Sequence, residues 1–446
     1  MLFQSQVFML GFLPPVLLLF HAARTQRMRE WVLIGASLLF YGGWDWRFVP
    51  ALVGLTLANW GVVWLWARNG RRGWLAAGVA LNLVVLGVCK YADFVLGNVS
   101  AVLGMSVAPT GIILPLGVSF FTFQKISYLI DLRRGDRHVY GLRAFFTFVT
   151  FFPQLIAGPI ARHNELIPQL ARLTAAGWAG IGQGLVLFGW GLAQKLLLAD
   201  PAGQVADPLF AAAGTGLLTL GQAWLAAGAY GLQILFDFSG YSDMAIGLGL
   251  MFGLRLPDNF AAPYRATSLQ DFWRRWHMTL SRWLRDYVYV PLGGRDRAAR
   301  NVMLTMLAGG LWHGAAWGFV AWGAAHGVAL AINGAWARAR WRMPAVLGWA
   351  ITLMFVLTAW VLFRAPDFTT AGTVLRGMAG LSGWGGAAVA PALWVGAAVA
   401  LLAPPSQVLA ARLPRPWMAW PVGAALAGLV LLAGGRVPSE FIYFQF

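Results

Sequence analysis

Charge is scarce in this sequence. Only 11% of its 446 residues are Asp, Glu, Lys or Arg, while 59% are hydrophobic, including 24 Trp and 29 Phe. A soluble domain carries roughly a quarter charged residues. A chain this apolar cannot cover its surface with polar groups in water, so lipid must be the solvent for much of it. The composition therefore excludes an ordinary soluble protein and predicts an integral membrane protein.

Cysteine is nearly absent as well, since Cys89 is the only one and lies inside an apolar run. A single cysteine excludes intramolecular disulfides and a thiolate metal cluster. The six histidines show no His-x-x-x-His spacing, which argues against a zinc site on one helix. We therefore expect no bound metal.

Common catalytic motifs are missing too. There is no Gly-x-Ser-x-Gly nucleophile elbow, no phosphate-binding glycine loop and no paired-carboxylate site. Asp237 and Asp243 are six positions apart, which does not place them on one face of a helix. We expect them to cap the polar stretch 237–243 or to line a cavity.

The net charge is +17, and many of the arginines lie in short loops between apolar runs. This is the positive-inside pattern, and it predicts that these loops are cytoplasmic. The basic residues do not form one stripe that could face a nucleic acid groove, so we expect no nucleic acid partner and contacts with membrane lipids instead. The loops contain Arg24, Arg27 and Arg29; Arg68, Arg71 and Arg72; Arg133, Arg134 and Arg137; and Arg338, Arg340 and Arg342.

Long apolar runs without period-2 alternation predict helices rather than a barrel. At about 20 residues per span, they suggest about ten to twelve transmembrane helices. Polar groups, prolines and glycines interrupt residues 99–135 and 143–160, which favours broken or re-entrant helices there. No internal repeat is visible, and we expect one domain over residues 1–446. The expected spans are 3–23, 31–44, 48–66, 74–95, 183–199, 217–236, 303–332, 346–363, 392–403 and 417–433.

The segment 272–287 is amphipathic at helical spacing. Its aromatic and aliphatic residues fall on one face and its arginines, which include Arg274 and Arg282, on the other, with His277 at the border. This pattern predicts a helix in the membrane interface. Its arginines suit either lipid headgroups or the phosphates of a cytoplasmic donor, and the sequence does not separate the two.

His313 follows Gly309-Gly310 in an apolar run. The glycines allow another backbone to approach closely. An ionisable residue at membrane depth marks function by default, and burial favours the neutral form that a general base needs. The alternative is a core histidine bonded to a carbonyl. His326 falls on the opposite side of the same predicted helix, so we expect a structural role for it.

Several motifs together resemble the membrane-bound O-acyltransferases, within them the bacterial branch that includes the alginate O-acetyltransferase membrane subunit. The resemblance covers nearly the whole chain. Its most specific parts are Asp271 to His277, Trp283 to Gly294 and Leu311 to Ala315, and the end of the chain, Phe441 to Phe446, is also similar. Further similarity lies in 116–124, 151–160 and 237–247, so that the core motifs occupy 115–160 and 237–327.

The resemblance implies a ring of helices around a central tunnel that joins the two faces of the membrane. It implies that His313 is catalytic and that His277 is the second polar residue of the site. We expect substrate contacts from Trp312, Arg274, Arg282, Gln124, Asp237 and Tyr241. The chain departs from the branch at Gln194-Lys195, where two lysines are more usual, and in the loop 295–300.

The implied function is O-acyl transfer, most simply of acetyl, from cytoplasmic acetyl-CoA for O-acetylation of an exopolysaccharide such as alginate or cellulose. Other envelope polymers, including peptidoglycan and teichoic acid, remain open. The resemblance further implies a bacterial inner membrane location, a periplasmic partner and no permanently bound cofactor. The alternatives are a transporter or flippase without its own chemistry, which also needs polar groups at membrane depth, and a structural subunit of a secretion complex.

Overall fold

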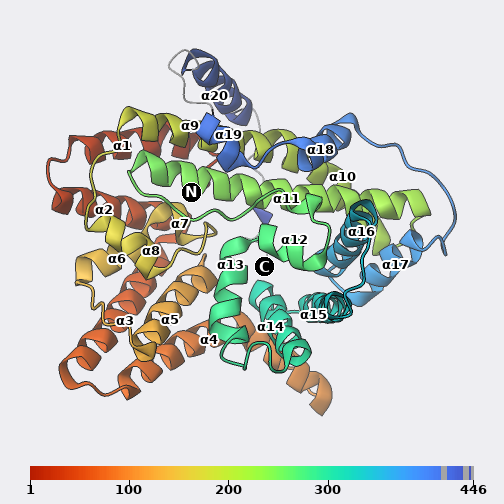
Figure 1. The fold of residues 1–446 in the computed structure, drawn as a ribbon, viewed down its shortest axis with the longest axis horizontal. Coiled ribbons are helices and arrows are strands. Elements are labelled where there is room, and N and C mark those ends of the chain that lie inside the picture. The colour runs from red at the N-terminus through yellow and green to blue at the C-terminus, as the bar shows by residue number, and fades with distance from the viewer. Residues whose placement is uncertain (413–418, 435–440, 443–446) are drawn as a thin grey trace. The chain divides into compact units, whose positions relative to one another are not determined.

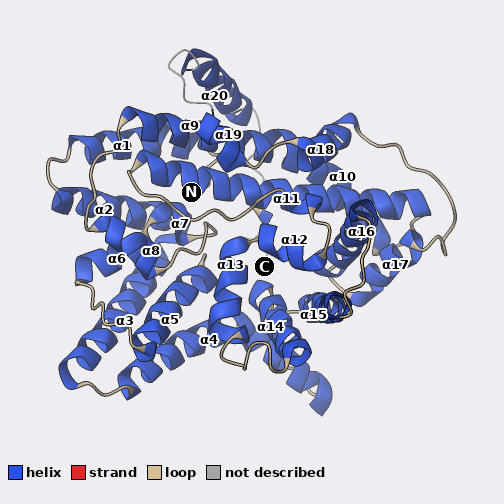
Figure 2. Ribbon diagram, viewed as in Figure 1, coloured by secondary structure: helices blue, strands red, loops and turns tan. Residues whose placement is uncertain are grey.

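The computed structural model describes residues 1–412, 419–434 and 441–442. All regular structure in these residues is helical, and no strand occurs among them (Figure 2). The prediction of an all-α protein is confirmed. The chain divides into two compact units: Met1–Gly189, Ser242–Pro257 and Ala410–Pro438 form unit 1, and Trp190–Tyr241, Asp258–Leu409 and Ser439–Phe446 form unit 2. A single domain over the whole chain stays a prediction.

Unit 1 is built mainly from helices of the N-terminal part of the chain, coloured red to yellow in Figure 1. Helix α9 (Trp178–Ala193) begins in this unit and α11 (Leu220–Met251) ends in it. The other helices are α1 (Leu13–Ala22), α2 (Gln26–Asp45), α3 (Val49–Asn69), α4 (Gly73–Leu103), α5 (Val118–Arg134), α6 (Leu142–Thr150), α7 (Phe152–Leu155), α8 (His163–Leu170) and α20 (Ala419–Gly434).

Helix α5 forms the centre of unit 1, because nearly all of its residues are buried. It starts after Gly117, whose φ of +72° is left-handed. A Cβ at this position would lie 2.6 Å from the Leu155 carbonyl oxygen, so a larger residue would not fit. The predicted interruption of 99–135 is confirmed, since a non-helical stretch separates α4 from α5. The interruption of 143–160 is confirmed by the break between α6 and α7.

Unit 2 holds the remaining helices together with the end of α9 and the first part of α11, while α19 ends in unit 1. A π-helical turn, Gln194–Ala199, joins α9 to α10, and another, Arg285–Tyr289, follows α13. The helices are α10 (Asp200–Ala213), α12 (Leu269–Arg275), α13 (Met278–Leu284), α14 (Ala298–His313), α15 (Trp317–Arg338), α16 (Ala345–Arg364), α17 (Phe368–Met378), α18 (Pro391–Leu402) and α19 (Ser406–Arg412).

Four helical stretches of the described residues are long and apolar enough to cross a membrane: Gln26–Asn69, Gly73–Leu103, Trp178–Ala213 and Ala345–Arg364. The pair α18 and α19, bent by 77°, makes a fifth if it counts as one span. These stretches support a multi-pass membrane protein. The ten to twelve crossings and the central tunnel stay predictions, because breaks divide several of the other predicted spans.

Two expectations on helix continuity were wrong. The predicted span 303–332 is a pair of helices, α14 and α15, separated at Gly314–Ala316. The predicted span 217–236 does not end before the polar stretch 237–243, because helix α11 continues through it to Met251. The backbone of a helix satisfies its own hydrogen bonds, so only the polar atoms of the side chains in this stretch need partners.

Candidate functional site

His277 lies in a break between α12 and α13 rather than at the border of one amphipathic helix. The single helix predicted over 272–287 was therefore wrong. His277 has φ 42° and ψ 53°, a left-handed conformation that is uncommon for residues other than glycine and costs free energy. Such strain persists only where the surroundings impose it, and it clusters at functional sites.

Asn259 imposes this conformation from outside the two helices. Its backbone carbonyl accepts the Met278 N–H at 2.9 Å. Its side-chain oxygen accepts the Thr279 N–H at 3.2 Å and the Thr279 hydroxyl at 2.9 Å, and it lies 3.2 Å from His277 Nδ1. Both Asn259 and His277 are fully buried. The break in the helix is thus held by a residue 18 positions away in the sequence.

These bonds also fix where His277 carries its proton. A backbone N–H can only donate, so the Asn259 atom that faces Thr279 must be the amide oxygen. His277 Nδ1 therefore donates to this oxygen, and its Nε2 presents a lone pair. That Nε2 is buried and has no hydrogen-bond partner among the described residues. His277 lies outside the candidate spans, and burial lowers its pKa to about 3, so the ring is neutral.

We predict that Asn259→Ala lowers activity about tenfold or more, because the imidazole loses the acceptor that fixes its tautomer and orientation. Asn259→Asp keeps an acceptor oxygen and should restore most of the rate. The measurement is the dependence of transfer rate on acceptor concentration for both variants. An Asn259→Ala enzyme with unchanged rate at every concentration would show that Asn259 does not position His277.

His313 is the last residue of α14 and is 4% exposed. It does not lie inside one long helix, as the sequence suggested, but at the tip of the α14–α15 hairpin. Aromatic rings surround it, with centroids 5.0 Å away in Trp312, 5.3 Å in Trp322 and 5.1 Å in Phe363. The apolar surroundings exclude water, and this strengthens electrostatic interactions with any group bound there.

The two predicted histidines lie together in unit 2. The centroids of the His277 and His313 rings are 6.3 Å apart, and the Trp312 ring lies 5.8 Å from that of His277. This separation lets both imidazoles contact one small reacting group. The structure thus brings together His313, His277 and Trp312, which the sequence proposed separately.

Glycines allow α14, the helix that ends at His313, to pack closely against α15. A Cβ on Gly310 would lie 2.3 Å from the Phe319 carbonyl oxygen, and one on Gly323 would lie 2.5 Å from the Met306 carbonyl oxygen. Helices α14 and α15 therefore pack with their backbones in contact. The close approach that Gly309-Gly310 predicted is confirmed at Gly310, while a Cβ on Gly309 would meet only the Leu284 side chain, at 3.1 Å.

Tyr241 and Asp237 lie on α11 and are buried in unit 2. The Tyr241 ring stacks on Phe441 at 4.6 Å, and Phe441 also contacts Phe238, whose ring lies 4.6 Å from His277. Of the C-terminal motif, Tyr443 to Phe446 lies outside the described residues. The aromatic contacts place Phe441, near the end of the chain, one side chain away from His277.

The Asp237 carboxylate is bound by protein groups. One oxygen lies 2.7 Å from Lys195 Nζ, and the other accepts the Ile442 N–H at 2.6 Å. Lys195 Nζ also lies 3.0 Å from Asp200. The Asp237 and Lys195 side chains are 2% and 6% exposed. Asp237 therefore anchors chain segments in this structure, and a substrate contact from it stays a prediction.

The other predicted substrate residues are dispersed. Arg274, at the end of α12, is exposed, and Arg282, on α13, is half-buried. Gln124 lies on α5 in unit 1, where it is 2% exposed and its side-chain oxygen has no hydrogen-bond partner among the described residues. No described group of three or more His, Cys, Asp or Glu residues could hold a metal ion.

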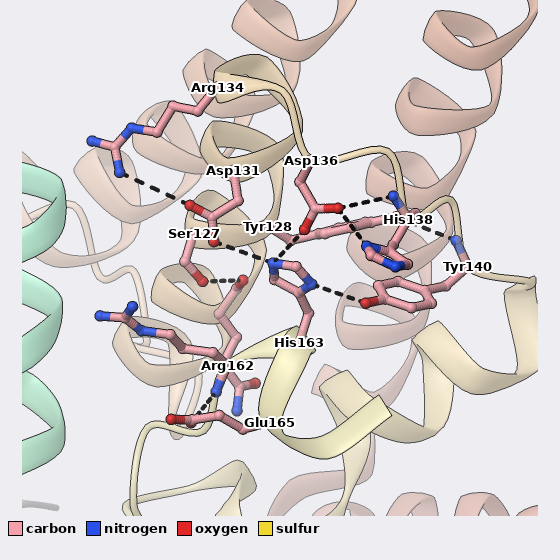
Figure 3. Close-up of polar contacts among 11 residues, drawn as sticks. Ser127, Tyr128, Asp131, Arg134, Asp136, His138, Tyr140, Arg162, His163 and Glu165 are labelled. Carbon is pink, nitrogen blue, oxygen red and sulfur yellow. Dashed lines mark hydrogen bonds and ion pairs between the residues drawn. The ribbon is translucent and has the colours of Figure 1, made fainter. Parts of the chain in front are cut away.

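Unit 1 contains a second polar cluster that the sequence did not suggest (Figure 3). His163, at the start of α8, is buried, with Nε2 3.2 Å from Asp131 and 3.8 Å from Asp136, and with Nδ1 3.2 Å from the Tyr140 hydroxyl. Burial by itself raises the pKa of Asp136, but hydrogen bonds from His138 outweigh this and hold the pKa below its ordinary value. The cluster ties the loop after α5 to α8, and only the fold brings its residues together.

Comparison with known proteins identifies the family. The sequence profile of MBOAT, the membrane-bound O-acyltransferase family, matches residues 114–369. These residues include both histidines and the whole of the core motif ranges 115–160 and 237–327. The chain belongs to the membrane-bound O-acyltransferase family. The family assignment made from the motifs is thereby confirmed.

Relatives within the family cover most of the chain. The chain is 42% identical over 402 residues to a protein of Pseudomonas aeruginosa named probable alginate O-acetylase AlgI, covering 86% of this chain and 76% of the relative. It is 39% identical over 427 residues to the peptidoglycan O-acetyltransferase of Helicobacter pylori, covering 86% and 80%. A teichoic acid D-alanyltransferase of Streptococcus thermophilus is 31% identical over 246 residues, covering 50% and 57%.

Proposed function

We propose that this protein is a membrane O-acetyltransferase that takes acetyl from cytoplasmic acetyl-CoA and delivers it across the bacterial inner membrane for O-acetylation of an envelope polysaccharide. The observation that carries the proposal is the buried pair His277 and His313 within the region that matches the family. The names of the two relatives with the greater coverage support acetyl as the transferred group.

In the proposed reaction His313 removes the proton from an acceptor hydroxyl as its oxygen attacks the thioester carbonyl of the donor. The new C–O bond forms, the C–S bond breaks, and the proton passes from His313 to the leaving sulfur. The acetyl group is thus transferred with no change of oxidation state. No cofactor need remain bound between turnovers.

His277 has a different role in this proposal. Its Nε2 lone pair can accept a hydrogen bond but cannot donate one to the thioester carbonyl. Orienting the acceptor therefore fits this lone pair better than polarising the donor carbonyl. An acceptor with a second hydroxyl beside the reacting one could give one proton to His313 and donate a hydrogen bond from the other hydroxyl to His277.

Arg274 and Arg282 are proposed to hold the phosphates of the donor, because guanidinium groups match phosphate oxygens in paired geometry. Gln124, Asp237, Tyr241 and Trp312 remain proposed substrate contacts. A periplasmic partner would complete transfer to the polymer. Identity does not choose the polymer, since the relatives named after alginate and peptidoglycan are 42% and 39% identical to this chain. Membership of an acyltransferase family disfavours the transporter alternative.

The test is acetyl transfer by the purified protein in vesicles. Labelled acetyl-CoA is supplied outside, with alginate or peptidoglycan fragments as acceptors and with or without a candidate periplasmic partner. We expect loss of label from the thioester and label on a hydroxyl of one acceptor. If the folded protein leaves acetyl-CoA intact but uses a different acyl donor, the donor assignment is wrong. If it uses no donor, the transporter alternative gains support.

A further inference from the structure

A cavity of about 400 Å³ lies in unit 2, between α11, α16 and α18. On α11 its lining residues recur at intervals of three and four positions and so form one face of the helix. Gly228 belongs to this face, and no atom lies within 4 Å of the place where its Cβ would stand. The glycine therefore leaves an open groove in the helix surface. The cavity is lined on α11 by Gly221, Trp224, Leu225, Gly228, Ala229 and Leu232.

The lining offers almost no hydrogen-bonding group. Its one side-chain hydroxyl, that of Tyr264, donates to the Gly231 carbonyl at 2.6 Å and accepts from the Trp360 indole at 3.1 Å. The remaining lining side chains are aliphatic or aromatic. A cavity of this size and polarity does not hold water well, whereas it falls in the range of about 300–1,000 Å³ that ligand pockets occupy.

Arg265 does not line the cavity but is bonded to a residue that does. Arg265 follows Tyr264 in the chain, and its Nε donates to the carbonyl of Leu401, a lining residue, at 2.6 Å. This bond caps the C-terminal end of α18 and uses one nitrogen only. The two terminal nitrogens of the guanidinium have no hydrogen-bond partner among the described residues. They are held beside an apolar cavity, where a phosphate would match them in paired geometry.

The cation lies near the end of α16 that the positive-inside pattern predicts to be cytoplasmic. The residue Thr267 contacts the beginning of α16, since a Cβ on Gly348 would lie 2.6 Å from the Thr267 carbonyl oxygen. The loop before α16 carries Arg340 and Arg342, and basic loops of this kind face the cytoplasm. Two α16 residues deeper along the helix, Leu353 and Leu357, line the cavity. A headgroup at Arg265 would therefore send its chain toward the membrane interior.

We propose that this cavity binds one anionic phospholipid of the inner leaflet, with its phosphate on Arg265 and one alkyl chain between α11, α16 and α18. The chain would enter past Trp394 of α18, which is 66% exposed. The inference depends on the membrane location of the protein and not on the proposed acetyl transfer. Because the Tyr264 ring lies parallel to that of Trp276 at 6.4 Å, the bound chain would support the residue next to His277.

The experiment uses a phosphatidylglycerol with a photoreactive diazirine at the end of one acyl chain. The protein is reconstituted in phosphatidylcholine vesicles that contain this probe, illuminated, and digested for peptide mapping. We expect cross-links concentrated in the lining residues of α11 and α16, and stronger competition by unlabelled phosphatidylglycerol than by added phosphatidylcholine. This competition uses the wild-type protein and so does not depend on the folding of any variant.

Variants separate the two parts of the site. Gly228→Leu fills the groove and should abolish these cross-links, while Gly372→Leu, at an equally open helical glycine outside the cavity, should retain them. Arg265→Gln should weaken competition by phosphatidylglycerol about tenfold or more, which is the loss of affinity expected when one charge-assisted hydrogen bond is removed. Arg265→Lys keeps the charge and should weaken the competition less. Cross-links spread evenly over lipid-facing helices, or equal competition by both lipids, would overturn the proposal.

Discussion

Replacing His313 with glutamine is expected to lower the rate of acyl transfer by roughly 10²–10⁴-fold, the usual contribution of a general base. Glutamine fills much of the same volume between Trp322 and Phe363, so the fold should be retained. His313→Ala should lose the same activity with a larger cavity. The measurement is the initial rate of label transfer from acetyl-CoA, together with thermal unfolding of each variant.

His326→Gln is the matched control. His326 is buried, and its ring lies 4.7 Å from that of Trp322, which also contacts His313 at 5.3 Å. Its Nδ1 accepts the Trp273 indole N–H at 3.3 Å, a structural contact. The control should transfer acetyl at close to the wild-type rate. A His313→Gln enzyme of normal rate would remove His313 from the mechanism, and equal losses in both variants would point to the packing of Trp322 instead.

Replacing Lys195 with methionine is expected to lower the free energy of unfolding by about 3–5 kcal/mol, the cost of removing one partner from a buried ion pair. The carboxylates of Asp237 and Asp200, now 2.7 and 3.0 Å from Lys195 Nζ, would face each other without a cation. Thermal unfolding of the purified protein in detergent, followed by tryptophan fluorescence, measures the loss.

Two further variants identify the cause of that loss. The double variant Lys195→Met, Asp237→Leu removes the buried anion as well and should recover much of the stability, because apolar replacements of buried ion pairs are often tolerated. Lys125→Met is the control for a buried lysine: Lys125 Nζ lies over the Phe121 ring and has no hydrogen-bond partner among the described residues. A stable Lys195→Met protein, or a double variant no better than the single one, would contradict the prediction.

The sequence predicted the helical class and the family, because composition and short motifs record these directly. The motifs also pointed to the two histidines, whose rings the structure places 6.3 Å apart, while their catalytic role stays a prediction. It did not predict the break at His277. The segment 272–287 has the periodicity of one helix, and the group that interrupts it, Asn259, is distant in the sequence. Local periodicity contains no information about such a partner.

The hairpin at His313 was missed for a related reason. Residues 303–332 are apolar throughout, so hydropathy shows no boundary, and only the contact of Gly310 with the backbone of Phe319 reveals the turn. The cluster around His163 and the ion pairs of Lys195 were equally hidden, because their partners come from separate helices. Residues that share a motif were found, and residues that meet only through the fold were not.

The two histidines are positioned by different contacts within unit 2. His277 depends on the side chain of Asn259, whereas His313 depends on the glycine-lined contact between α14 and α15. Residues around α12 and α13 can therefore be varied while His313 keeps its position. Changes to Gly310 or Gly323 offer no such freedom, because a single added methyl group would displace the helix that carries His313.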